Sequence, residues 1–407
     1  MTAPNFGMTF ARPNTEPVPV LGADFSQMLL IETAVGADAT MFPIGEVRRI
    51  STSDPEALAK LGTGPLRDAV SGVNAQLEGL NTGADVTIYR VAEGATPAAT
   101  AANIANALGQ AGYIPDEVDA TPRLVWAGRT AFRPDPAAAG PVVAALPEAL
   151  EKLLAIAAVD VDDTSRANAV AARETMSSQR LMPIGIAARV YEGDVLVTRP
   201  MGPRVLGLFA RVDNENQGKP FDPIANRAIN VAGLSRKIRF SFLDGSTEGQ
   251  QMLDAQVAIA AKGQVNVDGA VAQGGFTFIG ADNAQTGTLW QQIHQVRGAD
   301  YITVKLIQIY RHFLGGKVEV DSVEAMVNSV RFMLRDHKKD GDILGYNRDV
   351  FIPDQNSPEK VRLGRFKLDL GIEPAPMFRR IDTELHRYRP AVDELVANIV
   401  ARLNRVA

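Results

Sequence analysis

The stretches DVTIYRV (residues 85–91) and PRLVWAG (residues 122–128) decide the fold. Both are short runs of apolar and β-branched residues bounded by turn-forming residues, a pattern that predicts strands. The Ala-rich segment between them, residues 98–108, favours a helix. Because strands and helices alternate here, the sequence predicts a layered α/β domain.

The same alternation continues on both sides of these stretches. Residues 27–32 and 182–190 are further strand candidates. Residues 142–158 and 164–178 favour helices, with a short strand over residues 156–161 as the alternative between them. Asp54 and Pro55 predict a helix start, because Asp caps free amides and proline suits the first helical position. We therefore expect an outer α/β domain over residues 23–268.

Longer helices distinguish the region that follows, for which we expect an inner α+β domain over residues 269–376. Residues 237–243 and 275–280 still alternate as strands do, but residues 288–314 favour one long helix. Residues 321–339 give the clearest helix, with Asp321 as the expected cap and Glu324 three positions later. Its apolar stripe consists of Val323, Met326, Val327, Val330, Met333 and Leu334.

The two ends of the chain are the unusual feature. Residues 1–22 hold four prolines, which forbid helix and predict an extended N-terminal arm. Near the other end, a strand over residues 366–372 is followed by Pro374-Ala375-Pro376, and a second alternating strand is expected over residues 378–388. A last amphipathic helix begins at Pro390, so residues 377–407 form a strand arm and terminal helix.

A strand held away from its own sheet leaves unpaired backbone groups. It either folds back locally or pairs with the sheet edge of another chain. The candidate inter-subunit residues are Phe378, Arg380, Ile381, Thr383, Leu385 and Tyr388.

Composition excludes several classes of function. The chain has no cysteine, which removes disulfides, thiolate metal sites and cysteine nucleophiles. The net charge of −5 argues against a dedicated nucleic-acid binder, and no apolar run is long enough to insert in a membrane. The acidic residues Asp160, Asp162 and Asp163 fit a solvated loop better than a cation site, because the calcium-loop pattern is missing.

A search for catalytic chemistry finds no site. The four histidines, His294, His312, His337 and His386, do not stand at metal-ligand spacings, and no phosphate-binding loop is present. We therefore expect no catalytic residue, metal or cofactor.

Four basic residues near the end of the clearest helix have two interpretations. Arg331, Arg335 and Lys338 recur at spacings of four and three, and Lys339 follows. The positive charge suits the carboxyl end of a helix dipole, so a solvated helix end explains it. A docking ridge for an acidic partner is the alternative.

Across most of its length the chain resembles the tail sheath proteins of contractile-tailed bacteriophages, in the shorter form of temperate phages. The resemblance lies in the order and spacing of segments, including TAVGADATMFPIGEVRRIST, GADVTIYRVAEG, PRLVWAGRT, RAINVAGLSRKIRFSF, GGFTFIGADN and SVEAMVNSVRFMLRDHKKDG. It ends with LGRFKLDLGIEPAPMFRRIDTELHRY, which in that family is a strand, a proline-bearing spacer and a strand lent to a neighbour.

This resemblance implies a structural polymer and not an enzyme. Sheath subunits form a helical cylinder around a tail tube, share arm strands, assemble in the host cytoplasm as part of the virion tail, and contract to drive the tube through an envelope. The implied partners are further copies of the chain, the tube protein, and baseplate and tail terminator proteins, with Arg331, Arg335, Lys338 and Lys339 as candidate tube-facing residues. Three alternatives remain: the sheath of a tail-like bacteriocin or related injection device, a cytoplasmic α/β enzyme, and a tube or capsid protein.

Overall fold

A computed structural model describes residues 24–78, 83–347, 351–352 and 355–405. The contacts within the chain divide it after Ala375 into two units, the body up to Ala375 and the C-terminal arm from Pro376. Each unit is described by itself. The predicted N-terminal arm, residues 1–22, lies outside the described residues.

A six-stranded sheet organises the body, with strand order β2-β3-β1-β4-β5-β6. Every neighbouring pair from β3 to β6 is parallel, and only β2 at the edge runs antiparallel. All six residues of β1 are buried, as expected for a parallel strand covered on both faces. The α/β prediction is therefore confirmed. The strands are β1 (Met28–Thr33), β2 (Val47–Ser51), β3 (Asp85–Val91), β4 (Leu124–Ala127), β5 (Ile156–Asp160) and β6 (Leu181–Ile184).

Helices cover this sheet in two packed pairs, α3 with α5 and α2 with α7. Gly207 lets α7 approach α2 closely, because a Cβ there would lie 2.5 Å from the carbonyl oxygen of Val73. Asp54 caps α1 through the amides of Glu56 and Ala57, as predicted. The helices are α1 (Pro55–Lys60), α2 (Pro65–Ala75), α3 (Pro97–Gly109), α4 (Ile114–Val118), α5 (Pro141–Leu153), α6 (Arg166–Glu174) and α7 (Gly202–Glu215), with a 3₁₀ turn at Ala111–Tyr113.

Two small antiparallel sheets extend the body. One has the order β10-β7-β8, and the other has the order β11-β12-β9, next to helix α8 (Glu248–Asp254). Their strands are β7 (Ala188–Glu192), β8 (Val195–Arg199), β9 (Arg227–Ala228), β10 (Gly233–Leu234), β11 (Ile259–Lys262) and β12 (Phe276–Ile279). The predicted strand at residues 275–280 is confirmed as β12.

The strand predicted over residues 237–243 is wrong. This segment joins no ladder; Phe242 N–H donates to the Gly269 carbonyl, and the Arg239 carbonyl accepts from Gly249. Its alternation arises because Ile238 is buried and Phe240 is half-buried, while the intervening residues face outward. An extended segment that is buried on one side thus has the same alternating sequence pattern as a strand, although it pairs with no other strand.

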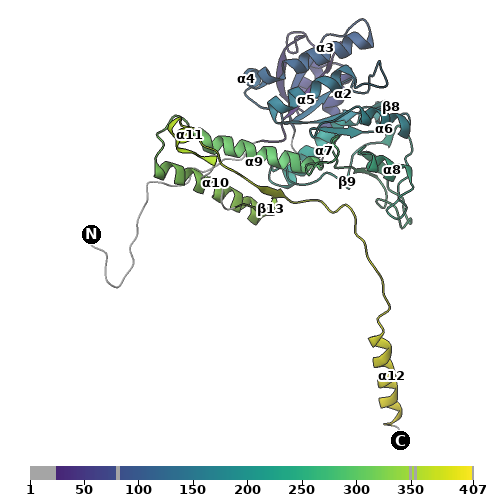
Figure 1. The fold of residues 1–407 in the computed structure, drawn as a ribbon. Coiled ribbons are helices and arrows are strands. Elements are labelled where there is room, and N and C mark those ends of the chain that lie inside the picture. Colours follow the sequence, from purple (N-terminus) through teal and green to yellow (C-terminus); the bar gives the residue numbers. More distant parts are fainter. Residues whose placement is uncertain (1–23, 79–82, 348–350, 353–354, 406–407) are drawn as a thin grey trace, which may run out of the picture. The chain divides into compact units, whose positions relative to one another are not determined.

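Two long helices, α9 (Ile293–Arg311) and α10 (Val320–Asp340), run side by side (Figure 1). They confirm the predicted long helices, but the predicted Asp321 cap is wrong. Glu319 occupies the cap position without a side-chain bond, and Asp321 lies in the first turn. The two helices contribute to a second hydrophobic core, which also contains residues from outside the hairpin. The core consists of Phe25, Phe221, Tyr301, Ile302, Ile309, Val330, Met333, Leu334 and Ile343.

Buried ion pairs join α9 to the rest of the body. Arg297 lies 2.6 Å from Asp213 of α7, with both side chains almost fully buried. One turn along α9, Asp300 lies 2.5 Å from Arg180, which precedes β6. Because Asp213 is fully buried and Asp300 nearly so, each carboxylate depends on its arginine partner, and each pair holds α9 in a defined position on the body.

The body ends with a two-stranded antiparallel sheet of β13 (Ile343–Tyr346) and β14 (Ile372–Pro374), and the short helix α11 (Pro358–Arg362) lies between the two strands in the chain. The strand predicted over residues 366–372 is thus shorter and later than expected, and Leu368 makes only an isolated bridge to Phe351. The arm ends in α12 (Pro390–Leu403), the predicted amphipathic helix. A domain boundary at residue 268 would separate β11 from its partner β12, and the predicted division into two arms and two domains stays a prediction.

Candidate inter-subunit interface

The C-terminal arm begins with an extended segment that belongs to no sheet. Residues 376–388 have no regular secondary structure and join no ladder in the described chain. Its apolar side chains face solvent, with Phe378 93% and Leu385 96% exposed. Ile381, Thr383 and Leu385 share one face of an extended chain, because alternate residues point the same way. All six predicted interface residues lie on this segment, and their pairing with another chain stays a prediction.

The sheet of β13 and β14 offers free edges for such a segment. It contains two strands in the described residues, so each strand has one edge without a partner. Asn347 strengthens the existing pairing, since its N–H donates to the Gly371 carbonyl at 3.0 Å and its side chain accepts from Gly371 N–H. Unpaired edge groups of this kind are a template for strand addition.

His294 of α9 holds the point at which the arm leaves the body. Its Nε2 lies 3.2 Å from the carbonyl oxygen of Ala375, the last residue of the body. The imidazole is 1% exposed, and its Nδ1 has no hydrogen-bond partner. Burial lowers the pKa of His294 to about 4, and the charge of Arg297 acts in the same direction. The imidazole is therefore neutral near pH 7, with Nε2–H donating to Ala375.

The predicted basic residues all lie on α10, in its second half. The Arg335 side chain is 63% exposed, lies 3.3 Å from Asp336 and stacks over Phe332. Lys338 and Lys339 are exposed in the last turn, where positive charge suits the helix dipole, and Arg331 is half-buried. The position is compatible with both interpretations of the sequence, and tube contact stays a prediction.

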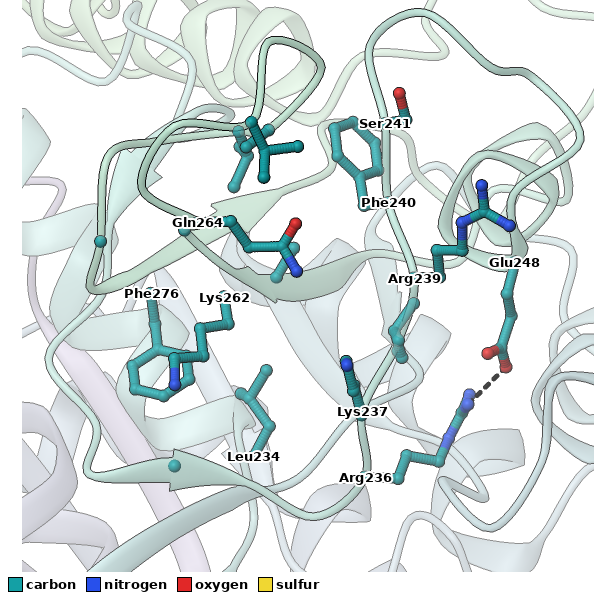
Figure 2. A pocket seen from close by; sticks show the side chains of 18 of the residues that line it. Leu234, Arg236, Lys237, Arg239, Phe240, Ser241, Glu248, Lys262, Gln264 and Phe276 are labelled. Carbon is teal, nitrogen blue, oxygen red and sulfur yellow. Dashed lines mark hydrogen bonds and ion pairs between the residues drawn. The ribbon is translucent and has the colours of Figure 1, made fainter.

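A basic cleft that the sequence analysis missed lies between β10, residues 235–243 and residues 263–274 (Figure 2). It encloses about 1360 Å³. Lys237, Arg239 and Lys262 line it, and Arg236 there is paired with Glu248, the one carboxylate among the described lining residues. This lining suits an acidic surface and lacks a nucleophile–base pair. The misread alternation of residues 237–243 was its only signal in the sequence.

Asp160 was expected in a solvated loop, but that expectation is wrong because its side chain has a structural role inside the body. Asp160 is buried and accepts from the Met201 and Gly202 amides at 2.9 Å and from Trp126 Nε1 at 2.8 Å, so it caps α7. The described residues contain no group of three or more side chains that could hold a metal ion. Nor does any described helix combine the length and apolar character needed to cross a bilayer.

No protein-family model matches the chain. The "Putative prophage major tail sheath protein" of Pseudomonas aeruginosa (strain UCBPP-PA14) is 24% identical over 349 residues, covering 84% of this chain and 85% of that protein.

The solved structures that are similar to this chain are also sheath proteins. The contracted helical sheath of the anti-feeding prophage (AFP) is similar with a TM-score of 0.66 at 14% identity, covering 95% of this chain and 99% of its own. The contracted PVC sheath of an extracellular contractile injection system has a TM-score of 0.68 at 12% identity, covering 95% and 98%. A sheath tail protein of Desulfitobacterium hafniense has a TM-score of 0.52 at 9% identity, covering 83% and 91%. These matches confirm the resemblance inferred from the sequence: the chain has the fold of contractile tail-sheath proteins.

Proposed function

We propose that this protein is the subunit of a contractile tail sheath, which polymerises as a helical cylinder around a tail tube and contracts to drive the tube through an envelope. The protein is structural, and its place is in a phage tail or tail-like particle. We extend the proposal to the absence of enzymatic activity, to assembly in the host cytoplasm, and to contacts with tube, baseplate and tail terminator proteins.

The proposal is supported by two features that occur together in one chain, an exposed extended arm and a sheet with open edges. Residues 378–388 expose the apolar side chains of Phe378, Ile381, Leu385 and Tyr388 and have no partner strand in the described chain. The β13–β14 sheet has free edges that such a segment can extend. A donor and an acceptor on the same chain produce a head-to-tail contact, and repeated head-to-tail contacts that do not close form a helical filament.

The strength of one junction fits a polymer that must move without separating. Each added backbone hydrogen bond contributes about 0.5–1.5 kcal/mol net, so several of them hold neighbours together. We place a hinge at the body–arm boundary, after Ala375, so that a body rotates there while its strand stays paired with a neighbour. The basic residues of α10 would then make exposed charge contacts with the tube, which are weak and easily released.

Truncation tests the proposal. A chain ending at Ala375 should remain folded but form no cylinders in negative-stain microscopy, whereas a control lacking only residues 404–407 should polymerise as the full chain does. Normal cylinders from the chain that ends at Ala375 would contradict arm sharing.

A tail-like bacteriocin or injection device would use the same sheath chemistry, and the solved structures similar to this chain come from such devices. Purified particles distinguish the two alternatives: a capsid with packaged DNA indicates a phage, and tails without a capsid indicate a bacteriocin or injection device.

A further inference from the structure

An apolar groove lies at the free end of the α9–α10 hairpin. One cleft of about 860 Å³ is formed by the turn after α9, the first half of α10 and residues 364–368. A second cleft of about 480 Å³ adjoins it and shares Val318, Val323 and Phe366 with it. Leu314 and Val318 remain 80% and 48% exposed there. The further apolar lining includes Phe313, Val320, Met326, Val327, Phe351 and Leu368.

Helix α12 presents an apolar stripe with nothing packed on it in the described chain. None of its residues is buried. The stripe residues are 47–68% exposed, although they recur at the i, i+3, i+4, i+7 spacing of a helix that packs against a partner. They are Val392, Leu395, Val396, Ile399, Val400 and Leu403. An isolated helix of this length is marginal in water, so α12 needs a surface to cover the stripe.

The charges around the groove match those of α12. Exposed His312, Lys317 and Arg365 border the larger cleft. Exposed Glu319 and Glu324 border the smaller one, together with the half-buried Arg331. In α12 the order is the reverse, since Asp393 lies in the first turn and Arg402 in the last. Laid with its first turn at the larger cleft, α12 places each end against the opposite charge.

The arm also has the length to deliver α12 to this groove in a neighbouring copy. The chain runs from Phe366 and Leu368, which line the groove, into β14, whose last residue Pro374 pairs with Ile343 just after α10 ends. A strand added antiparallel to β14 therefore runs back towards the groove. Residues 376–389 reach about 46 Å when extended, and α10, with 21 residues, is about 32 Å long.

We propose that α12 of one copy lies in the α9–α10 groove of a second copy, with its first turn beside Lys317. The inference rests on the proposed arm sharing and adds a second contact, in which an amphipathic helix enters an apolar groove next to the shared strand. The strand supplies backbone hydrogen bonds, and the helix supplies the side-chain burial that fixes which edge and which direction the strand takes.

The absence of cysteine makes a direct test available, because any introduced pair is unique. Leu314→Cys with Val392→Cys joins the larger cleft to the first turn of α12, and Val318→Cys with Leu395→Cys provides a second pair. The matched control combines Leu314→Cys with Ala401→Cys, which faces away from the stripe. Each variant is assembled, checked by microscopy, oxidised and run on a non-reducing gel.

We expect a ladder of covalent oligomers from both stripe pairs and at least tenfold less from the control. Cylinders without a ladder would overturn the groove inference and leave the sheath function standing, whereas a wild-type chain that forms no cylinders would overturn both. A fast-migrating closed monomer would assign the contact to a single copy. Replacing Val392→Cys by Phe10→Cys tests the N-terminal segment; a ladder from that pair and none from the stripe pairs would give the groove to residues 1–22.

Discussion

Acid should weaken the body through His294, because the buried imidazole resists protonation. Its pKa is lowered to about 4 by burial, whereas an unfolded histidine has its usual value of about 6.5. Between these values the unfolded chain binds more protons than the folded one, so the free energy of unfolding falls as the pH falls. From about pH 7 to about pH 5 the loss amounts to about 2 kcal/mol from this one group.

The variant His294→Gln isolates that contribution. The glutamine amide can still donate to the Ala375 carbonyl but does not titrate. Unfolding in urea, followed by the fluorescence of Trp126 and Trp290 in dilute full-length protein, gives the free energy at each pH. We expect the variant to lose about 2 kcal/mol less than the wild type on acidification.

The control is His312→Gln, which replaces an exposed histidine at the end of the same helix. It should lose as much stability as the wild type, because carboxylates elsewhere titrate equally in all three proteins. Equal losses in the wild type and in His294→Gln would refute the reasoning, since the buried imidazole would then carry no pH dependence.

Three further perturbations test other contacts. Arg297→Ala should lower the free energy of unfolding by about 3–5 kcal/mol, because Asp213 is left charged and buried. Adding Asp213→Leu should recover part of that lost stability. A loss under about 1 kcal/mol from Arg297→Ala alone would contradict the role of the buried pair. Gly207→Ala should cost about 1–3 kcal/mol by pushing α7 from α2, while Gly109→Ala, where a Cβ meets nothing within 4 Å, should cost none. Arg331→Glu with Arg335→Glu should keep the circular dichroism spectrum but abolish cylinder formation on purified tubes; unimpaired cylinders would argue for a solvated helix end.

Burial on both faces explains why the central sheet could be predicted from the sequence. The strands β3 and β4 are short apolar runs that end in turn residues, and α10 carries a full apolar stripe, so local pattern and tertiary role agree. Residues 237–243 show the opposite case, since burial on one side gives the same alternation with or without a ladder. Pairing depends on neighbours far along the chain, and alternation alone carries no information about them.

The sequence predicts where the arm begins, but it does not predict the groove that we propose receives the arm's terminal helix. Pro374 and Pro376 mark where the arm begins, because proline interrupts regular structure. The groove in contrast is assembled from three separated parts of the chain, residues 310–331, residue 351 and residues 361–368, and none of them is unusual alone. The Arg297–Asp213 pair was missed for the same reason: 84 positions separate two residues that each look ordinary in the sequence.

The two ion pairs on α9 have a mechanical consequence. Arg297 and Asp300 lie three residues apart, and each is bound to a different element, α7 in one case and the start of β6 in the other. Two attachment points prevent a helix from swivelling about either one. A rotation of the central sheet is therefore transmitted to the α9–α10 hairpin, because the sheet and the hairpin move together.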